Sequence, residues 1–145
     1  HCAARYGERC VAAVVESAPA YIGDETLAGI RQAREAFRQQ DQFARLERFH
    51  GEKSRWVLSA WVDTWLSPQF AHWSLEAVLP LMRCPALVIH GSEDDFGSVR
   101  HPETIARLAG GPVELEIMEG VRHVPHRETE PQVMDLVTRF LAHCP

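Results

Sequence analysis

The sequence predicts an α/β protein in which a parallel sheet is interrupted by a helical insert. Three short apolar segments, at residues 11–15, 86–90 and 113–117, are rich in the aliphatic residues that favour strands. Amphipathic stretches with apolar residues three or four positions apart follow the second and third segments. Strands that alternate with helices are typical of parallel sheets. We therefore expect three parallel strands with flanking helices and one inserted cap.

Residues 1–22 are expected to hold the end of a helix and the first strand. Residues 1–6 have the pattern of the last helical turns, and Gly7 suits a left-handed helix stop. The segment 11–15 is continuously apolar, which predicts a strand covered on both faces, as in the interior of a parallel sheet.

Residues 23–80 are expected to form the helical cap. Asp24 can begin a helix, a second short helix is expected at about 43–49, and a third carries several tryptophans and stops before Pro68. All four tryptophans lie between residues 56 and 73. We interpret this stretch as an insert because it interrupts the alternation of strands and helices.

Residues 81–145 are expected to return to the α/β pattern. Pro85 opens the strand 86–90, and Pro102 suits the first turn of a helix over about 101–108. The segment 113–117 alternates strictly, as a strand near a sheet edge does. A last helix starts near Pro131, with an apolar stripe made by Val133, Val137, Phe140 and Leu141.

The composition excludes several function classes. The formal net charge is −5 with scattered acidic residues, so we expect no nucleic-acid partner and no membrane partner. No apolar run approaches the roughly 20 residues that a membrane-spanning helix needs. The four cysteines form no C-x-x-C pair, which favours reduced thiols in a cytoplasmic protein. We expect no cofactor and no metal ion.

Two chemically useful side chains follow consecutive predicted strands. Asp94 lies four residues after His90 at the end of one strand, and His123 follows the next strand. Ligand sites in parallel sheets lie beyond the carboxyl ends of the strands. A carboxylate there can accept the histidine Nδ1–H, which leaves Nε2 to act as a general base. The order acid then base is that of the last two members of a Ser-Asp-His triad.

These residues carry a resemblance to a known family. From Val11 onward the chain resembles the C-terminal portion of the α/β-hydrolase fold superfamily, through residues 84–95 (CPALVIHGSEDD) and 120–131 (GVRHVPHRETEP). In the family the second segment commonly reads G-H-x-x-H-x-E-x-P, and the histidine matching His123 is the catalytic base. Here Arg122 stands where the family often has glycine.

The resemblance also implies what is missing. Residues 1–10 resemble the helix after the family's nucleophile, which places that residue before His1, in an elbow that the sequence lacks. A serine there implies ester chemistry, while an aspartate would imply dehalogenase or epoxide-hydrolase chemistry. A cysteine remains open as well.

Several neighbouring residues offer alternatives. Asp95 is adjacent to Asp94 and is the rival acid, although we expect it to face solvent. Ser17 follows the first strand, but its flanking residues do not form a nucleophile elbow. His126 with Asp94 and His123 is a weak pattern for a metal site, and a role in supporting the loop is the simpler interpretation.

The aromatic residues suggest a binding pocket. Aromatic side chains at helical spacing are mostly packing residues. In the resembled family a cap at this position covers the active site, so Trp61, Trp65 and Phe96 are the candidate substrate-binding residues. An aromatic pocket favours an apolar, uncharged small-molecule substrate.

Two functions follow from these observations. The first is a hydrolase of small esters or related acyl compounds, carboxylesterase-like and inactive without the upstream nucleophile. The alternative is a non-catalytic fragment or binding module that associates with another chain. Its basis is the apolar strand at 11–15, whose open edge invites self-association or pairing with a missing N-terminal half.

Overall fold

The computed structural model describes residues 1–144, which divide into two compact units. The core unit comprises residues 1–21 and 74 onward, and the helical unit comprises Ile22–Trp73. The division falls where the sequence changes from alternating strands and helices to helices alone.

The core unit contains the expected parallel sheet of three strands, β1 (Ala13–Glu16), β2 (Ala86–Gly91) and β3 (Val113–Met118). Their order is β1-β2-β3, and both pairings are parallel. The fold class predicted from the sequence is thereby confirmed. Since all three strands run in one direction, their carboxyl ends lie at the same edge of the sheet.

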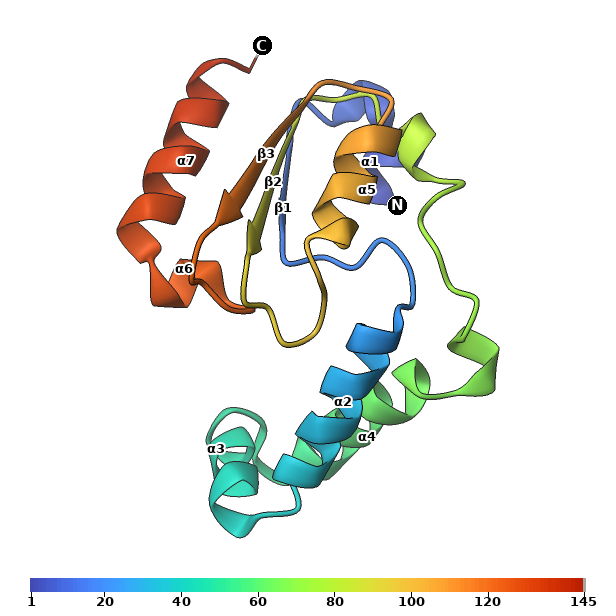
Figure 1. Ribbon diagram of the computed structural model, residues 1–145, viewed down its shortest axis with the longest axis vertical. Coiled ribbons are helices and arrows are strands. Elements are labelled where there is room, and N and C mark those ends of the chain that lie inside the picture. The colour runs from blue at the N-terminus through green and yellow to red at the C-terminus, as the bar shows by residue number, and fades with distance from the viewer. Residues whose placement is uncertain (145) are drawn as a thin grey trace. The chain divides into compact units, whose positions relative to one another are not determined.

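The central strand β2 supports both faces of the sheet, because every one of its residues is buried. Leu87 and Ile89 pack with residues of α7 (Glu130–Ala142), including Phe140. Val88 packs on the opposite face with Ile105 of α5 (Arg100–Leu108). Figure 1 shows α5 on one side of the strands, with α7 and the short helix α6 (Pro125–Glu128) on the other. The central strand is thus covered on both faces, as is typical of parallel sheets.

The first strand differs from its prediction in burial. β1 begins at Ala13, Val11 is 67% exposed, and Val14 is 44% exposed. Within the described residues β1 is an edge strand, so one side of it has no neighbouring strand to cover its apolar side chains. The prediction of a strand covered on both faces is therefore wrong for this segment.

The beginning of the chain forms the short helix α1 (Cys2–Arg5), as expected. Gly7 does not have the predicted left-handed conformation, because the backbone continues into a 3-10 turn at Gly7–Arg9. The N–H of Cys10 bonds to the carbonyl of Gly7, which satisfies that end of the turn without a positive φ.

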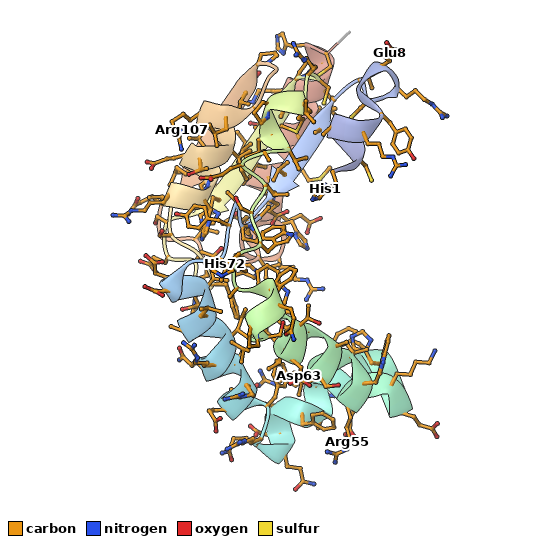
Figure 2. All side chains as sticks on the ribbon, turned by 90° about the vertical axis from the view of Figure 1, so that its right-hand side faces the viewer. His1, Glu8, Arg55, Asp63, His72 and Arg107 are labelled. Atoms are coloured by element: carbon orange, nitrogen blue, oxygen red, sulfur yellow. The ribbon has the colours of Figure 1, made fainter. Side chains whose placement is uncertain are left out.

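The helical unit consists of α2 (Asp24–Ala36), α3 (Gln40–His50) and α4 (Ser54–Trp65). Gly51 ends α3 with a φ of +53°, a conformation that glycine adopts without steric cost. Two further 3-10 turns, Gly51–Lys53 and Pro68–Phe70, flank α4. Arg55 and Asp63, labelled in Figure 2, both belong to α4, and the Arg55 guanidinium lies 5.1 Å from the centre of the Phe43 ring.

The helical unit is shorter than the predicted cap, since residues 74–80 belong to the core unit. Leu79, in the 3-10 turn Leu79–Leu81, is buried against Val88 and Ile105. A single bridge between Tyr21 and Ser74 marks the point where the chain returns. Apolar contact with the sheet, which the local sequence pattern does not reveal, decides this boundary. No helix among residues 1–144 is long and apolar enough to cross a membrane.

Candidate active site at the carboxyl edge of the sheet

The acid loop, residues 92–99, connects β2 to α5 and carries Asp94 at its turn. The Asp94 carboxylate accepts the N–H of Phe96 through Oδ1 at 2.7 Å, a local bond that aspartate commonly makes in turns. Its side chain is only 1% exposed. A buried carboxylate needs several donors to offset the loss of water, and the turn provides the first.

The base loop, residues 119–124, follows β3 and carries His123. Gly120 has a φ of +71°, and its N–H donates to the Ser92 hydroxyl at 2.9 Å. The N–H of Glu93 donates to the carbonyl of Val121, also at 2.9 Å. These bonds tie the base loop to the acid loop, so the two loops form one rim.

Asp94 and His123 meet at this rim. The His123 Nδ1 atom lies 2.9 Å from Asp94 Oδ1 and 2.8 Å from Oδ2. Because the carboxylate can only accept, Nδ1 carries the proton, and the neutral imidazole keeps Nε2 as its basic nitrogen. The His123 side chain is 40% exposed, so the buried acid orients a ring that other molecules can reach.

Phe96 lies beside the same histidine. The centres of the Phe96 and His123 rings are 4.7 Å apart, and the rings are tilted by 55°. This is a favourable separation for an aromatic pair. One predicted substrate-binding residue is therefore next to the predicted base.

Glu128 holds the backbone on both sides of His123. Its carboxylate accepts the N–H of Arg122 at 3.0 Å and the N–H of Val124 at 3.2 Å. Sequence reasoning did not assign Glu128 a role, although it is part of the quoted G-H-x-x-H-x-E-x-P pattern. Its spacing of five residues from His123 gives no hint of this contact, because the intervening turn α6 brings the two together.

Asp95 takes a different partner from Asp94. Its Oδ2 lies 2.6 Å from Arg122 Nη2 and 3.1 Å from Nε. The bond and the charge of Asp95 raise the pKa of the Arg122 guanidinium above its usual value. Both side chains are largely solvent-exposed, so the pair links the two loops from outside and adds little to stability.

His126 and Ser17 lie apart from the Asp94–His123 pair. His126 donates its backbone N–H to Glu16 Oε1 at 2.9 Å, and its ring Nδ1 lies at the same distance from that oxygen. Among residues 1–144, no group of three His, Cys, Asp or Glu side chains could hold a metal ion. The Ser17 hydroxyl is buried and has no hydrogen-bond partner within those residues.

Trp61 and Trp65 lie on α4 in the helical unit, whereas Phe96 belongs to the core unit. The Trp65 ring lies 5.4 Å from the Phe70 ring and 5.9 Å from the Trp73 ring, measured between centres. Trp65 is thus part of an aromatic cluster that packs the end of α4. Its contribution to substrate binding, like that of Trp61, stays a prediction.

The chain is similar in structure to several hydrolases. A membrane phospholipase A described as a bacterial virulence factor matches with a TM-score of 0.73 and 21% identity, covering 97% of this chain and 51% of the phospholipase. A serine hydrolase involved in carbazole degradation matches with a TM-score of 0.71 and 14% identity, covering 97% of this chain and 57% of the enzyme. The meta-cleavage product hydrolase CumD matches with a TM-score of 0.68 and 20% identity, covering 97% and 59%.

These likenesses show the fold, which is that of the C-terminal part of an α/β-hydrolase. The chain spans between 51% and 59% of the length of these three structures. No protein-family model matches the chain, and no curated protein matches it.

The close approach of the two loops predicts a strong effect of Gly91→Ala. A methyl group at Gly91 would collide with the backbone carbonyls of Val121 and Arg122. Because backbone atoms cannot move aside cheaply, we expect a loss of about 1–3 kcal/mol in the free energy of unfolding, measured by urea denaturation. The matched control is Gly7→Ala, where the added methyl meets nothing within 4 Å. Equal stabilities of the two variants would contradict the packing described here.

The pairing of His123 with only one of two adjacent acids predicts opposite results for Asp94→Asn and Asp95→Asn. The proton on His123 Nδ1 is held by Asp94, so its downfield NMR resonance is expected to be lost in Asp94→Asn and kept in Asp95→Asn. Loss of the resonance in Asp95→Asn alone would show that the acid was assigned to the wrong residue.

Proposed function

We propose that this chain supplies the acid and the base of a hydrolase that acts on small esters or related acyl compounds. The observation that carries the proposal is the bond from His123 Nδ1 to the buried Asp94 carboxylate, at 2.8 Å. The fold alone does not determine chemistry, because unrelated activities share it. A buried acid holding an accessible imidazole is more specific, since it is the pair that activates a nucleophile in acyl transfer.

In the proposed reaction His123 transfers two protons, one in each half of the reaction. Its Nε2 takes the proton of a serine hydroxyl as the serine oxygen attacks the ester carbonyl, and then gives it to the departing alcohol. A water molecule next loses a proton to Nε2 while attacking the acyl-enzyme, and the serine regains that proton as the acid leaves. Asp94 stabilises the imidazolium at each stage by accepting the Nδ1–H.

We propose that the nucleophile lies upstream of His1. Within the described residues the His123 ring bonds to Asp94 alone, and no serine hydroxyl contacts it. Ser17 is an unsuitable nucleophile because its hydroxyl is buried. A chain that spans little more than half of its structural neighbours leaves room for the nucleophile in the remainder.

The substrate class follows from the aromatic residues. Phe96 lies beside the catalytic imidazole, and we propose that it contacts the substrate there. We propose separately that Trp61 and Trp65 of the helical unit are substrate-binding residues. Aromatic contacts of this kind favour an uncharged acyl or alcohol group. All four cysteines are free thiols, which is consistent with the cytoplasmic location that we propose.

A second candidate function is association with another chain through β1. Its outer edge has no neighbouring strand within residues 1–144, and its side chains include the exposed Val14. β3, the other edge strand, carries Glu114 and Glu116, and such charges oppose strand pairing. The occupant of the β1 edge is either a second copy of this chain or an upstream segment of the same protein.

The proposed role of His123 predicts the effect of His123→Ala on esterase activity. In the protein expressed with the sequence that precedes His1, we expect kcat/KM for p-nitrophenyl acetate to fall by at least about 10³-fold, because the general base is lost. His143→Ala is the matched control, since the His143 ring bonds to the Arg139 carbonyl near the end of α7, and we expect unchanged activity. Undiminished hydrolysis by His123→Ala would refute the assignment.

Comparing residues 1–145 alone with the longer protein tests where the nucleophile lies and whether the chain belongs to a hydrolase. If residues 1–145 alone hydrolyse the ester, and Ser17→Ala abolishes that activity, the nucleophile lies inside this chain and its proposed upstream position is wrong. Activity that appears only with the preceding sequence, and that requires a serine there, supports the hydrolase proposal.

The open edge of β1 predicts that residues 1–145 self-associate in solution. Multi-angle light scattering is expected to give a mass above that of one 16.4 kDa chain, rising with concentration. A charged side chain on an edge strand opposes pairing, so Val14→Lys is expected to return the chain to a monomer. A monomer at all concentrations in the unaltered chain would count against pairing through this edge.

A further inference from the structure

His90 is a buried histidine that the proposed reaction does not use. It is the fifth residue of β2 and is 1% exposed. The register pairs Glu16 with Ile89, so the next position along the strands sets His90 beside Ser17. By strand alternation the His90 side chain belongs to the face of the sheet that carries Val88, which packs against α5.

The His90 ring forms a hydrogen bond to the far end of the acid loop. Its Nε2 lies 2.9 Å from the carbonyl oxygen of Gly97, seven residues further along the chain. A carbonyl oxygen only accepts, so Nε2 carries the proton and donates it. This bond joins the strand before the loop to the end of the turn that presents Asp94.

The same nitrogen also faces the catalytic acid. His90 Nε2 is 3.5 Å from Asp94 Oδ2, the oxygen that lies 2.8 Å from His123 Nδ1. The other oxygen, Oδ1, accepts the N–H of Phe96. The carboxylate therefore accepts the N–H of Phe96 and the Nδ1–H of His123, while the His90 ring, whose Nε2–H is donated to Gly97, lies against its Oδ2 and limits the room in which the carboxylate could turn.

Packing alone does not explain a histidine at this position. In the described chain His90 Nδ1 has no hydrogen-bond partner, and neither do the buried hydroxyls of Ser17 and Ser98. A buried polar atom without a partner lowers stability, a cost that an apolar side chain of similar volume would avoid. Ser17 also has a φ of +46°, which is unfavourable for a residue other than glycine. Such costs concentrate at functional sites, where the geometry matters more than stability.

We propose that His90 is a positioning residue that holds the acid loop and the Asp94 carboxylate in the orientation required by His123. The inference rests on the proposed hydrolase function and deepens it, since it names a third side chain on which the acid and base depend. His90 acts through its Nε2–H alone and does not touch the substrate.

Two substitutions distinguish the role of the Nε2–H from the role of the rest of the His90 side chain. His90→Gln places an amide NH₂ near the position of Nε2, whereas His90→Asn places it near Nδ1 and leaves the Gly97 carbonyl without a donor. We expect His90→Gln to keep the downfield Nδ1–H resonance of His123 and its single tautomer, and His90→Asn to lose both. Ring ¹⁵N chemical shifts report the tautomer directly, and a purely structural role of His90 would affect both variants alike.

The active, longer protein provides a second measurement. His90→Asn is expected to lower kcat for p-nitrophenyl acetate by about 10–100-fold with little change in KM, because a misplaced catalytic group costs rate more than binding. His90→Gln is expected to recover most of that loss. A folded His90→Asn protein with the normal His123 resonance and normal kcat would overturn the proposal.

The unaltered chain tests the proposal even if both variants fail to fold. The ¹⁵N shifts of His90 are expected to show a proton on Nε2 and a bare Nδ1, and the opposite tautomer would overturn the proposal. A failure of this proposal can be distinguished from a failure of the proposed hydrolase function. If His123 lacks its Nδ1–H bond in the unaltered chain, the hydrolase site itself is wrong, whatever His90 does.

Discussion

The site depends on one buried carboxylate that is held against one accessible imidazole. Asp94 is almost fully covered, so each of its oxygens must find donors inside the protein. The turn supplies one through Phe96, and His123 supplies another at hydrogen-bond distance from both oxygens. Because removing either partner would leave a buried charge without compensation, the geometry of the two loops is strongly constrained.

That constraint explains the local features of the rim. Gly91 permits the base loop to pass directly over the end of β2, and Glu128 fixes the peptide groups on both sides of His123. The ion pair between Asp95 and Arg122 joins the loops from outside. The parallel sheet makes these contacts possible, since β2 and β3 end at the same edge.

The outer side of β1 forms an open edge of the sheet, away from the rim that carries Asp94 and His123. β1 is paired only with β2 among the described residues, and it exposes apolar side chains that an interior strand would cover. The chain also covers little more than half of the hydrolases that it resembles in structure. The proposed upstream segment would complete the sheet at this edge as well as supply the proposed nucleophile.

The sequence by itself determined the order of the elements and the two loops that carry Asp94 and His123. Helical and strand periodicities are local, so they locate β2, α5, β3 and α7 from neighbouring residues alone. The tertiary structure decided which of two adjacent acids faces His123, and it gave roles to Glu128 and His90. It also showed that residues 74–80 belong to the core unit and that β1 is partly exposed. These features depend on contacts between residues distant in the chain, or on the direction of a side chain within a turn, and no spacing pattern encodes either.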